Sequence, residues 1–235
     1  MPASESLPTV LVPGLACSAR LYPDQAPALW PFGPVTIADH TRDDSMAAIA
    51  RRILQAAPPR FALVGLSMGG YISFEILRQA PDRVAKLALL DTTARPDAPE
   101  QSDRRRNQIV LAQTGRLRDV VDQLFPLFVH PDRHNDQALK ELVWTMAQET
   151  GAEAFIRQQT ALIGRPDSRP GLGAIACPTL VLVGDADALT PPDRAREMAD
   201  AISGARLVEV PGCGHLSTVE RPEAVTAALV EWARS

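Results

Sequence analysis

The segment from Phe61 to Tyr71 reads Phe-Ala-Leu-Val-Gly-Leu-Ser-Met-Gly-Gly-Tyr, an apolar run that ends in the pattern Gly-x-Ser-x-Gly. Residues 72–79 continue with a helical pattern, so the segment predicts a strand, a sharp turn and a helix. Such a turn holds its serine in a strained backbone conformation above the sheet edge, and the flanking glycines let the helix pack close to the strand. Ser67 is therefore the candidate nucleophile, with Gly65 and Gly69 as the two glycines. The alternative is that Ser67 is only a turn residue.

The rest of the chain alternates short apolar segments with helical patterns. This alternation implies right-handed crossovers and an α/β fold with a mostly parallel sheet of about six strands. In such a sheet, ligands bind at the carboxyl ends of the strands. The predicted strands are 9–12, 35–38, 61–66, 84–90, 179–183 and 206–210, and the predicted helices outside the central insertion include 45–57, 192–202 and 222–234.

Between residues 94 and 176 the strand signal vanishes, and the sequence predicts several helices separated by proline and glycine. An insertion after the fourth strand would cover the carboxyl edge of the sheet, where Ser67 is expected. We therefore expect a core of residues 1–93 and 175–235 and a helical cap of residues 94–174. A helical subdomain beside the sheet is the alternative. The predicted helices of the cap are about 102–114, 117–128, 136–149 and 152–163.

Composition narrows the possible partners and the compartment. Lysine and arginine total 24 against 28 aspartates and glutamates, and the net charge of −4 disfavours nucleic acid or an anionic membrane as a partner. The sequence has no signal-peptide pattern in its first residues and no apolar run long enough to span a bilayer, so we expect a cytoplasmic protein. Three scattered cysteines predict free thiols and no metal site. The oligomeric state is not predicted.

A catalytic serine needs a base within hydrogen-bond reach and a third group that orients this base. Of the four histidines, His215 follows the last strand in a glycine-rich loop, and His40 follows the second strand. Both would reach the carboxyl edge, whereas His130 and His134 lie among loop residues of the insertion. We favour His215 because on a scaffold of this kind the order along the chain is serine, acid, histidine. His40 is the rival.

The acid should follow a strand between Ser67 and His215, and the segment Gly-Asp-Ala-Asp at residues 184–187 offers two candidates. Together with the serine and histidine segments, it resembles the α/β-hydrolase family, including its serine esterases and enol-lactonases. By that resemblance the acid is Asp187, and Asp185 is a turn residue that hydrogen-bonds its own loop. Asp91, at the end of the fourth strand, is the runner-up because some members carry the acid there.

The resemblance also implies an oxyanion hole made by two backbone N–H groups. One would come from Met68, directly after the nucleophile, and the other from Leu15 in the glycine turn after the first strand. Pro13 stands where the family has a histidine. This departure removes no donor, but it leaves open how the turn is held in place.

The sequence thus predicts a serine hydrolase that cleaves small to medium esters through an acyl-enzyme and needs no cofactor or metal. The alternatives are a lactonase similar to the 3-oxoadipate enol-lactonases, a carbon–carbon bond hydrolase with the same triad, and a non-enzymatic ligand-binding protein. We expect short to medium apolar acyl groups, because apolar side chains of the cap would face the pocket. A substrate carboxylate could bind the run Arg104 to Arg106, but such a run is more often a solvated helix face. The candidate apolar residues are Leu124, Phe125, Phe128, Trp144 and Phe155.

Overall fold

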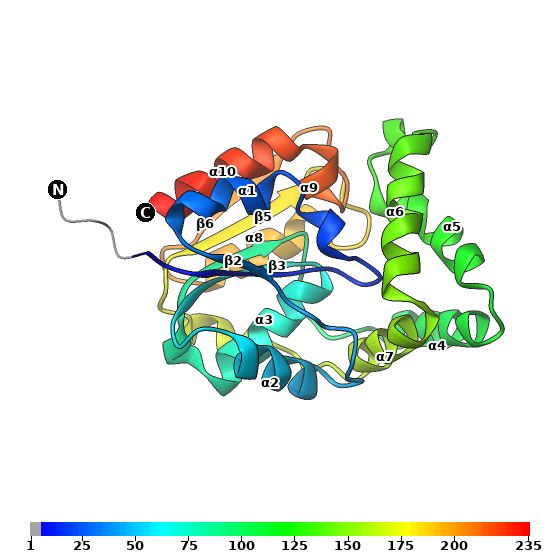
Figure 1. The fold of residues 1–235 in the computed structure, drawn as a ribbon, viewed down its shortest axis with the longest axis horizontal. Coiled ribbons are helices and arrows are strands. Elements are labelled where there is room, and N and C mark those ends of the chain that lie inside the picture. The colour runs from blue at the N-terminus through cyan, green and yellow to red at the C-terminus, as the bar shows by residue number, and fades with distance from the viewer. Residues whose placement is uncertain (1–5) are drawn as a thin grey trace.

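The computed structural model describes residues 6–235 and contains a six-stranded sheet in which neighbouring strands are all parallel (Figure 1). The strand order is β2-β1-β3-β4-β5-β6, which confirms the predicted α/β fold. The first five residues of the predicted core lie outside the described part. The strands are β1 (Thr9–Val12), β2 (Val35–Ile37), β3 (Phe61–Leu66), β4 (Val84–Leu90), β5 (Thr179–Gly184) and β6 (Arg206–Val210).

The central strands are mostly apolar because both faces of the sheet are covered. All residues of β1, β3 and β5 are buried. Register brings the carboxyl ends together, since Leu66 pairs with Leu90 and Leu90 pairs with Leu182. Residues that follow β3, β4 and β5 therefore meet at one edge of the sheet.

Helices lie on both faces of the sheet, and each contributes an apolar stripe to the core. Helices α1 (Gln25–Leu29) and α10 (Pro222–Arg234) cover one face, whereas α2 (Met46–Ala56), α3 (Met68–Gln79) and α8 (Pro192–Ala201) cover the other (Figure 1). The short helix α9 (Ser217–Glu220) follows the loop of His215. Within residues 6–235, no helix has both the length and the apolar character needed to cross a bilayer.

The insertion of residues 94–174 forms four helices that lie beyond the carboxyl ends of the strands (Figure 1). Their bounds agree closely with the predicted ones, and α5 continues through Pro126. A proline near the end of a helix breaks few backbone hydrogen bonds, and α5 ends two residues later. The division into a core and a cap stays a prediction. The helices are α4 (Pro99–Gln113), α5 (Leu117–Phe128), α6 (Gln137–Thr150) and α7 (Ala152–Ile163).

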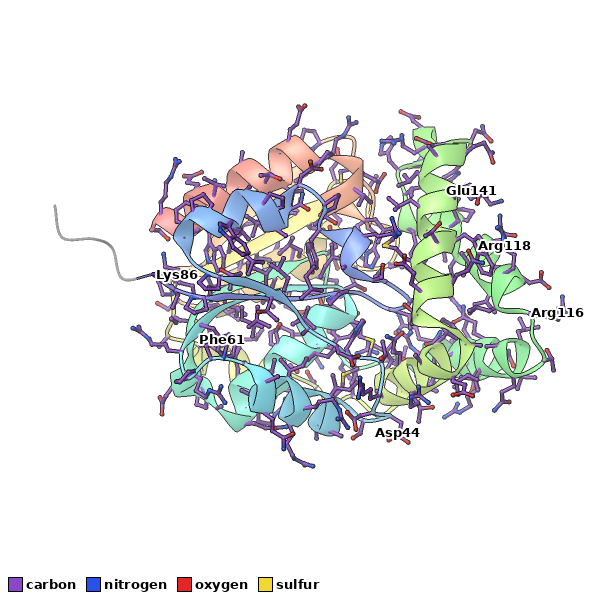
Figure 2. The ribbon with its side chains drawn as sticks, viewed as in Figure 1. Asp44, Phe61, Lys86, Arg116, Arg118 and Glu141 are labelled. Atoms are coloured by element: carbon purple, nitrogen blue, oxygen red, sulfur yellow. The ribbon has the colours of Figure 1, made fainter. Side chains whose placement is uncertain are left out.

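The side chains show how the insertion is oriented. Figure 2 shows Arg118 of α5 near Glu141 of α6 at the end of the molecule opposite Phe61 and Lys86 of the sheet, and the pair is 3.5 Å apart. The amides of His215 and Leu216 both donate to the carbonyl oxygen of Phe128, the last residue of α5. The insertion is thereby joined to the loop of the candidate base.

Candidate active site

Ser67 lies at the sharp turn between β3 and α3 with φ of 55° and ψ of −112°. A positive φ is strained for a residue with a side chain, and such strain persists only where the surroundings impose it. Here Ser67 N donates to the carbonyl of Leu90 at 2.9 Å, while Thr92 Oγ1 donates to the carbonyl of Ser67 at 2.8 Å. A Cβ on Gly65 would overlap the backbone of Gly69, and this close approach requires glycine. The predicted strand, turn and helix are all present.

His215 and Asp187 complete a continuous hydrogen-bonded chain with Ser67. His215 Nε2 lies 2.8 Å from Ser67 Oγ, and His215 Nδ1 lies 2.8 Å from Asp187 Oδ2. Because a carboxylate only accepts hydrogen bonds, Nδ1 carries the proton and Nε2 is free to accept one from the serine. The histidine and the aspartate are only 2% and 3% exposed. This arrangement can activate a hydroxyl nucleophile.

The carboxylate of Asp187 is held by its own loop. Its Oδ1 accepts hydrogen bonds from the amides of Leu189 and Thr190, both at 2.9 Å, and Oδ2 accepts one from Thr190 Oγ1 at 2.7 Å. Burial alone would raise the pKa of Asp187, but the charge and hydrogen bond of His215 hold it below its ordinary value. Asp187 therefore remains ionised beside the histidine.

His215 has its pKa set by opposing effects. Burial disfavours the charged ring, but the charge and the hydrogen bond of Asp187 outweigh burial and raise the pKa of His215 above its ordinary value. The more distant carboxyls of Asp91 and Glu220 act in the same direction. The charged imidazolium form of His215 is thus stabilised.

The two other candidate acids do not hydrogen-bond to His215. Asp91 accepts from the amide of Gly184 at 3.0 Å and from the hydroxyl of Ser217, so it joins β4 to β5 and to α9. Burial raises the pKa of Asp91 well above its usual range. Asp185 accepts from the amide of Cys213 at 3.0 Å, which ties its turn to the histidine loop, whereas we expected it to bond within its own loop.

The glycine turn after β1 lies directly against Ser67. A Cβ on Gly14 would be 3.5 Å from the Cβ of Ser67. Leu15 and Met68, the two predicted oxyanion donors, line the same cavity as Ser67. Among residues 6–235, neither of their amides donates a hydrogen bond. Both N–H groups are therefore available to a ligand.

Two buried side chains brace this turn, and the sequence identified neither in that role. His40 Nε2 donates to the carbonyl of Gly14 at 2.9 Å, and Gln158 Oε1 of α7 accepts from the amide of Ala16 at 3.0 Å. His40, the rival base, is thus directed at the backbone, and burial lowers its pKa. Ala16 itself has a φ of 55°. The position of His40 after β2 signals proximity to this edge, but no local pattern points to Gln158.

Glu220 of α9 is a further buried residue that the sequence did not reveal. Its Oε1 accepts from the amide of Gly214 at 3.0 Å, and its Oε2 accepts from the amide of His130 at 2.7 Å. One carboxyl thereby connects the loop of His215 with the end of α5. No local signal distinguishes this glutamate from the exposed ones.

The cysteines do not compete with Ser67 as nucleophiles. Cys17, Cys177 and Cys213 are all free, and Cys17 and Cys213 are buried. Burial raises the pKa of Cys17 to about 12, so it remains a thiol at neutral pH. Among residues 6–235, no group of three or more histidine, cysteine or carboxylate side chains is placed to hold a metal ion.

A cavity of about 430 Å³ contains Ser67 and His215 in its wall, a size suited to a small-molecule ligand. Of the five apolar residues expected there, Leu124 and Phe128 line it. Phe125 and Phe155 are buried elsewhere in the core, and Trp144 packs under the guanidinium of Arg118. The expectation was therefore only partly right, because helix packing directs those three side chains elsewhere.

Part of the cavity wall is cationic. Arg104 and Arg105 line it; Arg104 is also exposed, as expected of a solvated face, whereas Arg105 is half-buried. Arg106 is exposed and pairs with Asp103 at 2.6 Å. The other arginines of the wall are Arg95, Arg165 and Arg194.

Comparison with known proteins agrees with this architecture. The family model described as alpha/beta hydrolase fold matches residues 13–222. A Mycobacterium tuberculosis protein named as a non-heme bromoperoxidase is 30% identical over 187 residues, which are 76% of this chain and 69% of that protein. A thermophilic esterase from Thermogutta terrifontis has a TM-score of 0.88 and 31% identity, covering 97% of this chain and 89% of the other. The enol-lactonase from Burkholderia xenovorans LB400 has a TM-score of 0.86 and 25% identity, and the match covers 100% of this chain and 94% of the other. The chain belongs to the α/β-hydrolase family.

Proposed function

We propose that this hydrolase cleaves carboxylic esters of small to medium size through an acyl-enzyme intermediate. The observation that carries the proposal is the hydrogen-bonded chain from Ser67 Oγ through His215 to Asp187, beside two free amides. A serine hydroxyl is a weak nucleophile until a positioned base accepts its proton. No cofactor takes part in the proposed reaction.

In the first half of the reaction, Ser67 Oγ attacks the ester carbonyl carbon while its proton passes to His215 Nε2. The amides of Leu15 and Met68 donate to the resulting oxyanion. The tetrahedral intermediate then collapses, the bond to the alkoxy oxygen breaks, and His215 returns the proton to the leaving alcohol. In the second half, His215 activates a water that attacks the acyl-enzyme and releases the carboxylic acid and free Ser67.

The cavity supports a short or medium acyl chain. Each methylene transferred into the apolar part of the wall contributes roughly 0.8 kcal/mol, or about fourfold in affinity, until the space is filled. Overpacking then reverses the gain. In a series of p-nitrophenyl esters from acetate to palmitate, kcat/KM should pass through a maximum at the short or middle members. A maximum at palmitate would contradict the proposed size limit.

Replacement of Ser67 by alanine tests the catalytic role directly. Loss of a triad member lowers the rate by about 10⁴- to 10⁶-fold, so the variant should be inactive on these esters while its circular dichroism is unchanged. A fluorophosphonate reagent should label the wild-type protein at Ser67 and should leave Ser67→Ala unlabelled. Retention of a tenth of the activity by this variant would exclude the mechanism.

A lactonase is the second candidate. The similarity to an enol-lactonase along the full chain favours it, because the same groups can open a cyclic ester. A panel of esters, lactones and β-diketones distinguishes these activities from each other and from carbon–carbon hydrolysis. Hydrolysis of lactones alone would favour the lactonase, and a protein that binds esters without turnover or labelling would be a ligand-binding member of the family.

A further inference from the structure

The first turns of α4 present a polar face to the active-site cavity. Gln101, Arg104, Arg105 and Gln108 all line it, at the spacing i, i+3, i+4, i+7 that places residues on one face of a helix. This is the stripe that is usually apolar in a helix packed on a core. From residue 100 to residue 108, α4 has no apolar residue at all. The face is therefore suited to contact with a polar ligand.

Behind this face lies a buried ion cluster with an excess of positive charge. The carboxylate of Asp97, 1% exposed, accepts from Arg105 Nε at 2.6 Å and also from Arg165 Nη1. The two arginine side chains are only 18% and 5% exposed, and both line the cavity. One carboxylate thus balances two guanidinium groups, and a buried charge is costly until it is paired. An anion in the cavity would supply the missing partner.

The neighbouring amide side chains are oriented to donate. Arg105 Nη1 donates to Gln159 Oε1 at 2.9 Å, and because a guanidinium can only donate, the NH₂ group of Gln159 must face Gln108. Gln159 Nε2 accordingly donates to Gln108 Oε1 at 2.7 Å, which leaves the NH₂ group of Gln108 free. Gln101 Oε1 accepts from the amide of Ala98 at 2.9 Å, so its NH₂ group is free as well. Both glutamines of the wall offer donors.

The charge balance of the whole cavity points the same way. Of the residues that the structure describes, five arginines line it and no aspartate or glutamate does. Three carboxylates pair with these arginines from outside the wall, which leaves five positive charges against three negative ones. Among residues 6–235, Arg104 has no carboxylate within salt-bridge distance. This cationic wall occurs in a protein whose net charge is −4. The three carboxylates are Asp97, Asp193 and Glu197.

We propose that Arg104 and Arg105, with the amides of Gln101 and Gln108, form a subsite for a substrate carboxylate. The preferred substrates are then esters that carry a free carboxylate at the end of a short apolar chain, such as half-esters of dicarboxylic acids. This rests on the proposed ester hydrolysis at Ser67 and adds the recognition of the far end of the substrate. Guanidinium groups bind carboxylates in two-point geometry, which also fixes the orientation of the chain.

Two matched substrates test the subsite. Monoethyl glutarate carries a terminal carboxylate, and ethyl 5-methylhexanoate carries an isopropyl group of similar shape in its place. We expect the wild-type protein to have the larger kcat/KM for monoethyl glutarate, with a preference that decreases as ionic strength rises. A preference for the neutral ester, or no effect of salt on the ratio, would overturn the proposal.

Variants on one helix supply the control. Arg104→Gln should lower the ratio of the two kcat/KM values by about tenfold, the usual effect of losing one charge-assisted hydrogen bond. Arg106 lies two residues further along the same helix, is exposed and pairs with Asp103. Arg106→Gln should therefore leave the ratio unchanged. Equal ratios in the two variants would refute the subsite. Stronger inhibition by inorganic phosphate than by glutarate would refute its assignment to a carboxylate.

A binding measurement separates failure of the subsite from failure of the proposed hydrolysis. Calorimetry on Ser67→Ala should show glutarate binding that Arg104→Gln weakens in the same background. Glutarate binding in a protein that cleaves no ester would leave the anion subsite in place and remove the esterase. Ester cleavage without glutarate binding would leave the proposed hydrolysis in place and remove the anion subsite.

Discussion

Replacement of Asp187 by asparagine should disable the candidate base without displacing it. The amides of Leu189 and Thr190 both donate to Oδ1, so an asparagine at this position must keep its carbonyl oxygen there. Its NH₂ group then occupies the place of Oδ2, 2.8 Å from His215 Nδ1. A donor at that place requires Nδ1 to accept. The proton moves to Nε2, and the histidine can no longer take the proton of Ser67.

The expected size of the effect follows from this change of tautomer. The same substitution in a Ser-His-Asp triad of an unrelated fold lowers kcat by about 10⁴. At 1.36 kcal/mol for each tenfold change, this corresponds to about 5.4 kcal/mol of transition-state stabilisation. The folded protein loses little else, because two of the four hydrogen bonds to the carboxylate come from backbone amides that the asparagine oxygen still satisfies.

The assay compares kcat for p-nitrophenyl butyrate in the wild-type protein, Asp187→Asn and the control Asp185→Asn, with urea unfolding to check the fold. Asp185→Asn retains an oxygen that can accept from the amide of Cys213 and should keep most of the activity. An active Asp187→Asn beside an inactive Asp91→Asn would refute the tautomer argument and reassign the acid. A loss of activity that merely follows a loss of stability would refute it as well.

Further expectations concern pH, the glycine turn after β1 and the elbow, which is the sharp turn at Ser67 between β3 and α3. The kcat/KM value should rise with pH through an apparent pKa above about 6.5, because the base must be neutral and its carboxylate partner raises the pKa of His215. If this rise with pH disappeared in His40→Ala and persisted in His215→Ala, His40 and not His215 would be the base. His40→Ala should destabilise the protein by about 1–3 kcal/mol in urea unfolding, since a buried ring is removed and the carbonyl of Gly14 keeps only the amide of Cys17 as a donor. Unchanged stability would show that His40 does not brace the turn. Gly69→Ala should destabilise by about 1–3 kcal/mol or more because its Cβ would overlap the backbone of β1, whereas Gly164→Ala, with no atom nearer than 3.8 Å, should stay near the wild type. Equal stability of the two variants would mean that the elbow relaxes.

Much of the fold could be read from local pattern. Apolar runs that alternate with helical periods are visible over a few residues, and they predicted the six strands and the helices of the insertion. The elbow was equally legible, because a glycine on either side of Ser67 is a local requirement of a tight strand-to-helix turn. His215 followed from its place after the last strand and from chain order, whereas the resemblance to the family singled out Asp187 from Asp185. Their roles stay predictions, although the hydrogen bonds between them are those that the predicted roles require.

Tertiary structure alone decided what surrounds these residues. Gln158 reaches the amide of Ala16 across 142 positions of the chain, and no local pattern encodes such a contact. The run of arginines illustrates the same limit. A charged helix face is identical in sequence whether it meets water or a cavity. Only the packing of α4 over the carboxyl edge places the exposed Arg104 and the half-buried Arg105 in the cavity wall and leaves Arg106 out of it. Local sequence determines the conformation of a segment because its causes act within a few residues, but the chemistry of the pocket wall depends on which distant segments pack together.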